Sequence, residues 1–165
     1  MNITPITPTD KPVIQTWLSQ FLKEHLFWWT KSLHLGWDDL KIREHIEIHA
    51  LQEKAWERLL KDAGKPDNFV RIIRINDLTT GIIHASFDID TLIGLQMGQI
   101  QWIYVDPQKC GLGYGQHLLK IAHDWFSDKN LVGVRLHVNH CNDGAKSLYK
   151  KFGYQISDEE MLFAF

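Results

Sequence analysis

The sequence contains few cysteines, few prolines and no long apolar run, and each shortage excludes a class of protein. Two cysteines, Cys110 and Cys141, cannot form the disulfide framework of a small secreted domain. Eleven glycines and five prolines in 165 residues are too few for a collagen-like or low-complexity chain. No apolar run is long enough to cross a bilayer, and the N-terminal residues lack the order of a signal peptide. We therefore expect a folded domain in the cytoplasm, with both thiols free.

An excess of charge of one sign is also missing. The chain has 18 basic and 20 acidic side chains, a formal net charge of −2, and no basic run or acidic tail. Nucleic acids and anionic membranes are bound by clustered positive charge. We therefore expect neither as a partner.

Hydrophobic periodicity divides the chain into a helical first part and a mixed second part. It predicts a helix from residue 11 to the high twenties, and one from 38 or 39 to a stop at Gly64 and Pro66. Further helices are expected at 113–127 and 145–151. Strands are expected at 2–6, 68–76, 82–88, 98–105, 131–138 and 161–165, with a turn at 77–81. The pattern predicts a single mixed α/β domain over residues 1–165, in which residues 1–66 add helices.

The most informative segment is a strand followed by a glycine-rich turn and the start of a helix. Alternate glycines expose main-chain N–H groups, and the helix directs its positive end at the same place, so the turn can hold a pyrophosphate. A turn needed only for backbone geometry is the alternative. The sequence lacks the third glycine of a Rossmann motif and the Lys-Ser/Thr of a Walker A motif. The residues concerned are Ile103, Tyr104, Val105, Gln108, Lys109, Cys110, Gly111, Leu112, Gly113, Tyr114 and Gly115.

A second motif, LHVNHCNDGAKSLYKKFGY, covers residues 136–154. Alone it indicates a strand packed on a short helix, with Tyr149 as a core or rim aromatic. Together with VDPQKCGLGYGQHLL at 105–119, in this order and at this separation, it resembles the GNAT superfamily of acyl-CoA-dependent N-acetyltransferases. The resemblance covers residues 68–154, which it identifies as the CoA-binding core, with residues 1–66 on the acceptor side.

The resemblance implies a mixed, mostly antiparallel sheet flanked by helices, in which two splayed strands form the acetyl-CoA site. It implies that the pantetheine arm pairs with main chain near Ile103 and Val105, and that the pyrophosphate rests on the amides of residues 109–115. Asn142 would bond the pantetheine or the incoming helix. Tyr149 would protonate the leaving thiolate, whose pKa is about 8.5 by analogy with cysteine. Gln108 stands where many members carry Arg or Gln.

The implied reaction moves an acetyl group from acetyl-CoA to a primary amine by direct attack, without a metal. Many members carry an acidic general base on the strand before the glycine turn, whereas residues 99–102 here are Gln-Ile-Gln-Trp. Gln101 can orient a water but cannot accept a proton. The general base is therefore unassigned, and a non-catalytic acyl-CoA sensor is the main alternative. Binding of another nucleotide by the glycine turn is a third interpretation.

Histidines offer candidates for the missing base. His84 and His137 lie in expected strands, where either can face the site, although a solvent-facing strand histidine is the commoner arrangement. His45 and His49 have the spacing of zinc ligands on a helix but lack a third ligand, so we expect no metal site.

Tryptophan is abundant, and five of the seven residues lie within the first 56 positions. Trp17 and Trp56 follow apolar helix faces and are expected in the core. Trp28, Trp29 and Trp37 flank the connection 30–36. Three interpretations stay open for them: a lid that attracts a cationic acceptor, a patch for a homodimer, and plain packing.

Overall fold

The computed structural model describes residues 1–164, which form two compact units. The first unit combines Met1–Lys11 with Arg58–His137. The second combines Pro12–Glu57 with the residues from Val138 onward. The division falls inside two helices, α1 (Lys11–Ser32) and α3 (Leu51–Ala63). Within the described residues, no helix has the length and apolar character needed to cross a membrane.

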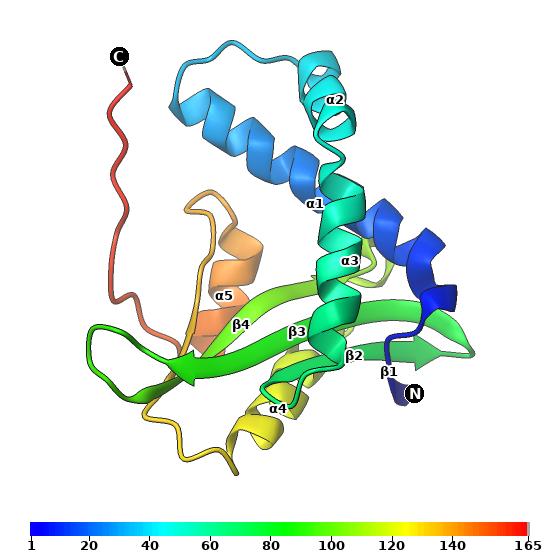
Figure 1. Cartoon of the computed structure of the whole chain (residues 1–165), viewed down its shortest axis with the longest axis vertical. Coiled ribbons are helices and arrows are strands. Elements are labelled where there is room, and N and C mark those ends of the chain that lie inside the picture. Colours follow the sequence, from blue (N-terminus) through cyan, green and yellow to red (C-terminus); the bar gives the residue numbers. More distant parts are fainter. Residues whose placement is uncertain (165) are drawn as a thin grey trace. The chain divides into compact units, whose positions relative to one another are not determined.

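The first unit is built on a five-stranded sheet with the strand order β1-β2-β3-β4-β5 (Figure 1). The strands are β1 (Asn2–Pro5), β2 (Asn68–Ile75), β3 (Leu78–Ile89), β4 (Gln96–Val105) and β5 (Val134–Leu136). Neighbouring strands are antiparallel except β4 and β5, which run parallel. This arrangement confirms the expected mixed, mostly antiparallel sheet.

Helix α4 (Tyr114–Phe126) packs against β2, β3 and β4 on one face of the sheet. Its buried stripe, Leu118, Leu119, Ala122 and Phe126, follows the helical period. Gly98 permits this close approach, because a Cβ there would lie 2.9 Å from the Phe126 ring. The last turn of α3 lies on the opposite face, where Asp62 meets His84 of β3. Helices therefore flank this sheet on both faces.

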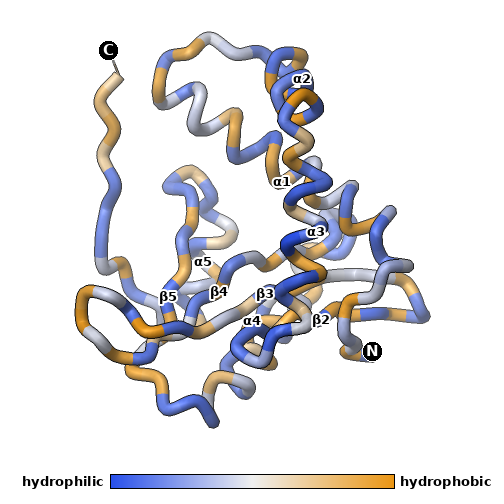
Figure 2. The backbone as a smooth tube through the Cα atoms, viewed as in Figure 1, coloured by the Kyte–Doolittle hydropathy of each residue, from blue (hydrophilic) through white to orange (hydrophobic). Residues whose placement is uncertain are grey.

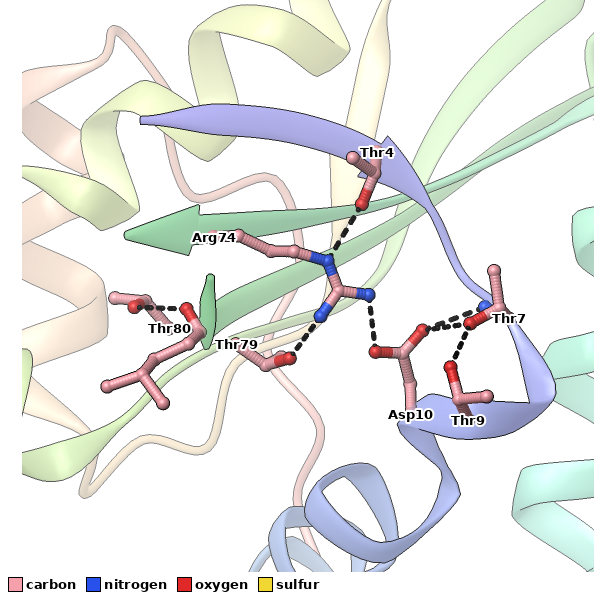
Figure 3. A network of polar contacts seen from close by, with 8 residues as sticks. Thr4, Thr7, Thr9, Asp10, Arg74, Thr79 and Thr80 are labelled. Atoms are coloured by element: carbon pink, nitrogen blue, oxygen red, sulfur yellow. Dashed lines mark hydrogen bonds and ion pairs between the residues drawn. The ribbon is translucent and has the colours of Figure 1, made fainter. Parts of the chain in front are cut away.

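A buried polar network ties the N-terminal segment to the sheet (Figure 3). The Arg74 guanidinium of β2 donates to Asp10 at 2.5 Å, to Thr79 at 2.7 Å and to Thr4 at 3.2 Å. The other Asp10 oxygen accepts from the amide and the hydroxyl of Thr7. Only 4% of Asp10 is exposed. Every oxygen of this carboxylate is thus satisfied, as burial of a charge requires.

The loop between β3 and β4 carries a hydrophobic tip, which Figure 2 shows in orange. Leu92, Ile93 and Leu95 are at least half exposed there. The Asp90 side chain accepts hydrogen bonds from the amides of Leu92 and Ile93 and pairs with Arg135. Asp90 also closes the loop through its main chain, whose amide donates to the Leu95 carbonyl and whose carbonyl accepts from the Gly94 amide.

The second unit contains most of α1, the helix α2 (Asp39–Ile48), the first part of α3, and α5 (Asp143–Lys151). Gln15 of α1 donates to Glu53 of α3 at 2.7 Å, and Gln52 donates to the Gln15 carbonyl at 2.6 Å. Trp17 and Trp56 are buried, with 6% and 3% exposed, which confirms that both belong to the core.

One expected helix proves to be two. The segment from 38 to 64 was predicted to be continuous, but α2 ends at Ile48 and α3 begins at Leu51. Ala50 between them has a φ of +47°, a left-handed conformation that no helix interior allows. Ile48, the last residue of α2, is 77% exposed. No glycine or proline stands at the break, so the apolar periodicity predicts one continuous helix.

Strand limits differ from expectation in three places. The hairpin between β2 and β3 turns at Asn76 and Asp77, which have φ of +47° and +61°, and residues 78–81 belong to β3 instead of the turn. Strand β5 covers only three of the eight residues expected at 131–138. Residues 161–164 form no strand, and Phe165 lies outside the described residues. Apolar, β-branched runs were read as strands there, but a strand also needs a pairing partner.

Candidate active site

Strand β4 has an open edge over its second half. Strand β5 pairs with β4 only at Gly98, Gln99 and Ile100, whereas β4 continues to Val105. The Asp106 amide donates to the Thr80 carbonyl of β3. Because N–H groups alternate in direction along a strand, those of Ile103 and Val105 point to the open edge. An extended ligand can therefore form strand-like hydrogen bonds with main chain at these two residues.

The open edge leads directly into the glycine turn. A short 3-10 helix, η2 (Pro107–Lys109), follows β4 and is capped by Asp106, whose side chain accepts from the Gln108 amide at 3.0 Å. Gly111 and Gly113 then adopt φ of +81° and +84°. A Cβ at either position would meet nothing within 4 Å. The left-handed backbone therefore requires these glycines, and the space beside them is open.

Helix α4 begins at this turn without a side-chain cap. Its N-cap is Gly113, which has no side chain to accept a bond from the first-turn amides, and the first turn carries no acidic residue. The amides of Tyr114 and Gly115 thus keep their donors for a ligand, at the positive end of the helix. Lys109, Cys110 and Leu112 are exposed around the turn. The Cys110 thiol lies 3.7 Å from the Asp106 carbonyl. This arrangement is able to hold a pyrophosphate.

A bulge in β4 brings two acceptor-side candidates together. Opposite the consecutive β3 residues His84 and Ala85 lie Trp102 and Ile100, so Gln101 is the extra residue. The Gln101 amide donates to Ser86 of β3 at 3.0 Å. Gln101 and His84 therefore lie on neighbouring strands beside the start of the open edge.

His84 is not the solvent-facing strand histidine that its residue type suggested. Only 7% of it is exposed, and burial lowers its pKa to about 4. Nε2 lies 2.8 Å from Asn68 Oδ1 and 3.8 Å from Asp62 Oδ2. His137, in contrast, is exposed and follows the end of β5.

Sequence reasoning missed Asp62 and Asn68 as partners of His84. Asp62 had a detectable signal, because it follows the buried Trp56 and Leu59 at steps of three residues on the inner face of α3. A carboxylate on an apolar stripe requires a partner. Asn68 had none, because the first residue of a strand is commonly polar.

In the second unit, Asn142 and Tyr149 lie at the two ends of α5. The Asn142 side chain caps the helix by accepting from the Ala145 amide at 3.0 Å. Tyr149 is buried, and its ring meets Tyr154 edge-on at 5.8 Å. Burial raises the pKa of Tyr149 to about 12. Its hydroxyl therefore stays protonated at neutral pH, as an acid must.

The three unassigned tryptophans belong to the second unit as well. Trp28 and Trp29 lie in the last turns of α1, and Trp37 precedes α2. The Lys31 ammonium lies 5.5 Å from the Trp28 ring centre, and that of Lys41 lies 5.3 Å from Trp37. Both ring faces thus already interact with a cation.

His45 of α2 forms a ring contact with His49, the residue that follows the helix. His45 and His49 lie 4.4 Å apart, centre to centre, and His45 also meets Trp37 at 4.9 Å. Among the described residues, no group of three or more His, Cys, Asp or Glu is placed to hold a metal ion.

Comparison with known proteins places this geometry in a family. The model of the acetyltransferase (GNAT) family matches residues 23–154, whereas no curated protein matches the sequence. The BH1408 protein from Bacillus halodurans has a similar structure, with a TM-score of 0.77 and 14% identity, over 100% of this chain and 99% of that one. A GCN5-related N-acetyltransferase from Ralstonia eutropha has a TM-score of 0.66 and 18% identity, over 98% and 96% of the two chains.

An aminoglycoside 6′-N-acetyltransferase from Acinetobacter haemolyticus is also similar, with a TM-score of 0.59 and 17% identity, over 100% of this chain and 98% of that one. At these identities the structural similarity shows the fold alone. The family model covers well over half of the sequence and includes both motifs. The chain belongs to the acetyltransferase (GNAT) family.

Proposed function

We propose that this protein transfers an acetyl group from acetyl-CoA to a primary amine by direct attack. Membership of the family supports acyl transfer in general. The observation that carries the proposal is the open edge of β4, which continues into the glycine turn and the uncapped start of α4. One continuous stretch of main chain thus offers donors to a pantetheine arm and then to a pyrophosphate.

The pantetheine arm, the pyrophosphate and the thioester oxygen of acetyl-CoA each have a partner in this proposal. Ile103 and Val105 pair with the pantetheine arm. The amides of residues 111–115 bond the pyrophosphate, aided by the Lys109 side chain, because the amides of Gln108, Lys109 and Cys110 already donate within the turn. The Ile103 amide is the better oxyanion donor, because alternation turns the Tyr104 amide toward β3. Asn142 supports the pantetheine or the start of α5, which it caps.

The chemistry requires one bond to form and one to break. The amine nitrogen attacks the thioester carbonyl, the C–N bond forms, and the C–S bond breaks through a tetrahedral intermediate. The leaving thiolate takes a proton from Tyr149, whose hydroxyl is protonated at neutral pH. The amine releases one proton to water, and one proton from water restores the tyrosine hydroxyl, so the products are the amide and the CoA thiol. Direct attack needs no metal ion and no covalent enzyme intermediate.

We place the acceptor on the side of residues 1–66, with Trp28, Trp29 and Trp37 as an aromatic lid. The exposure of Trp29 supports this, because an exposed aromatic ring can attract a cation, whereas the ring faces of Trp28 and Trp37 already meet Lys31 and Lys41. The competing assignment is a homodimer patch, supported by the 40% exposure of Trp29. We further propose that residues 1–165 act as one acetyltransferase domain in the cytoplasm, where its two exposed thiols stay reduced.

A non-catalytic acyl-CoA sensor is the second candidate. The observation in its favour is the absence of a carboxylate at residues 99–102, the stretch of β4 at which many members carry a general base. A panel of amines separates the two functions by release of CoA thiol. Thiol release with at least one amine supports the enzyme, whereas acetyl-CoA binding without release by any amine supports the sensor.

The variant Tyr149→Phe tests the role of the acid. We expect it to bind acetyl-CoA as the wild type does and to lower kcat by at least about tenfold, because only the hydroxyl is removed. Tyr154→Phe removes a hydroxyl from the ring that Tyr149 contacts and serves as the matched control. Unchanged turnover in Tyr149→Phe assigns this tyrosine to packing.

A further inference from the structure

The buried histidine of β3 sits in a polar cluster made of His84, Asp62, Asp67 and Asn68. A Cβ built at Gly81 of β3 would touch Leu118 of α4. Because side chains alternate along a strand, His84, three residues later, faces away from α4. Phe87 contacts Trp125 of α4 and confirms the alternation. His84 therefore lies on the face that α4 leaves free.

The hydrogen bonds of the cluster determine which nitrogen of His84 carries the proton. An N–H of the Asn68 side-chain amide donates to Asp67 Oδ1 at 3.1 Å. The Asn68 amide is therefore oriented with its oxygen toward His84, 2.8 Å from Nε2. Asp62 Oδ2, a second acceptor, lies on the same side at 3.8 Å. The hydrogen bond to the Asn68 oxygen requires the proton on Nε2, and the nearby Asp62 charge favours the same tautomer.

It follows that the other ring nitrogen carries a lone pair. No hydrogen bond from a described residue reaches Nδ1 of His84. Burial lowers the pKa of His84 to about 4. The Asp62 charge acts in the opposite direction and raises this pKa, whereas the charges of Arg58 and Lys65 lower it further. The ring is thus neutral at physiological pH, and its Nδ1 is a pre-oriented hydrogen-bond acceptor.

In the register of the sheet, His84 lies one pair away from the residue proposed to bind the thioester oxygen. His84 is the direct ladder partner of Trp102, and the next pair, Ile83 with Ile103, contains the proposed oxyanion donor. The bulge residue Gln101 lies beside it and is held by Ser86. The Ile103 N–H points to the open edge and His84 lies one strand inward, so an amine that approaches the carbonyl over the β3–β4 face passes His84 and needs an acceptor for its N–H there.

We propose that Nδ1 of His84 accepts a hydrogen bond from the acceptor amine and orients its nitrogen for attack, while the Asp67–Asn68 pair fixes the tautomer that makes this possible. The proposal rests on the proposed function and adds to it a residue that touches the amine. Asp67 and Asn68 are positioning residues, because they act through His84. The expected substrate is a primary amine with an N–H free to donate.

Two substitutions at one position separate the two ring nitrogens. His84→Asn places an amide oxygen close to the position of Nδ1, whereas His84→Gln places its amide near Nε2 and restores only the contact with Asn68. We expect His84→Asn to keep the amine KM within about threefold and His84→Gln to raise it about tenfold, the effect of one lost hydrogen bond. Neither should change the KM of acetyl-CoA. The reverse order, or activity that follows thermal stability alone, overturns the proposal.

Nuclear magnetic resonance of the ¹⁵N-labelled histidines tests the tautomer without turnover. We expect a neutral His84 with the proton on Nε2 between about pH 6 and 8, and a mixture of tautomers in Asn68→Ala. A proton on Nδ1 in the wild type overturns the proposal whether or not the protein is an enzyme.

A titration with amine in the presence of CoA completes the test. The probe is the best amine of the panel, or n-butylamine when none is turned over. We expect the Nδ1 resonance of His84 to shift, while the resonance of the exposed His34 does not. An unchanged Nδ1 resonance at saturating amine overturns the assignment. Failure of acetyl-CoA binding alone is a different result, which refutes the proposed function instead.

Discussion

At the scale of single residues, the most constrained groups are the buried charges of the first unit. Asp10 is 4% exposed, and its carboxylate is shared between Arg74 and the Thr7 amide and hydroxyl. Burial alone would raise the pKa of Asp10, but the Thr7 amide and Arg74 outweigh it and hold the pKa below its usual value. The network therefore stabilises the charged form, and with it the docking of the N-terminal segment.

Substitution of this carboxylate should cost stability. We expect Asp10→Asn to lower the free energy of unfolding by about 2 kcal/mol, because it removes charge-assisted hydrogen bonds and leaves Arg74 without its counter-charge. Asp124→Asn is the control, since the Asp124–Lys120 pair is 62% and 64% exposed. An exposed pair contributes about 0.5 kcal/mol or less. Urea denaturation measures both variants, and equal losses contradict the account.

His84 gives the stability a pH dependence of its own. Its pKa is about 4 in the folded chain and about 6.5 when unfolded, so the unfolded state binds the extra proton. The contribution of the neutral His84 to the free energy of unfolding is therefore fully present above pH 6.5 and falls as the pH drops toward 4. Between pH 7.5 and 5 we expect the wild type to lose about 2 kcal/mol more than His84→Asn. Parallel pH profiles would show that His84 does not remain neutral on folding.

At the scale of elements, the sequence was most informative where a local rule and the packing agreed. The helix after the glycine turn was expected at 113–127 and lies at Tyr114–Phe126, since its apolar stripe fits the face of the sheet. The strand 68–76 was found as Asn68–Ile75 for the same reason. Periodicity failed at Ala50, where a left-handed residue divides a continuous apolar pattern. It failed also at residues 161–164, because strand pairing depends on segments distant in sequence.

The break between α2 and α3 can be tested with two alanines. We expect Ala50→Gly to raise the free energy of unfolding by about 1 kcal/mol, because glycine adopts the φ of +47° without the cost that a Cβ imposes. Ala55→Gly, inside α3, should lower it by about 1 kcal/mol. Thermal unfolding of both variants decides the matter. A loss of stability in Ala50→Gly would indicate that α2 and α3 form a continuous helix in solution.

The candidate site was predictable only in part, for a similar reason. The glycine turn, Asn142 and Tyr149 belong to short motifs that can be read from neighbouring residues. His84 could be named from its strand, but its burial and its tautomer depend on Asp62 and Asn68, which come from two other elements. The open edge of β4 depends on where β5 ends, and the eight-residue apolar run at 131–138 concealed that limit.

At the scale of the whole molecule, the structural neighbours match this chain from end to end, while their sequences are less than 20% identical to it. The shared feature is the fold. This chain carries a buried, neutral histidine on β3 and no carboxylate on β4. Binding of acyl-CoA is therefore the best supported of the proposed properties, and the contact between His84 and the amine is the most specific one.

Calorimetric titration of the wild-type protein with acetyl-CoA tests the central claim most directly. The account predicts one site per chain with a dissociation constant below ~100 µM, from which CoA displaces the ligand and neither ATP nor NAD does. No heat of binding at several hundred micromolar acetyl-CoA, or binding of ATP or NAD that CoA cannot displace, would contradict it.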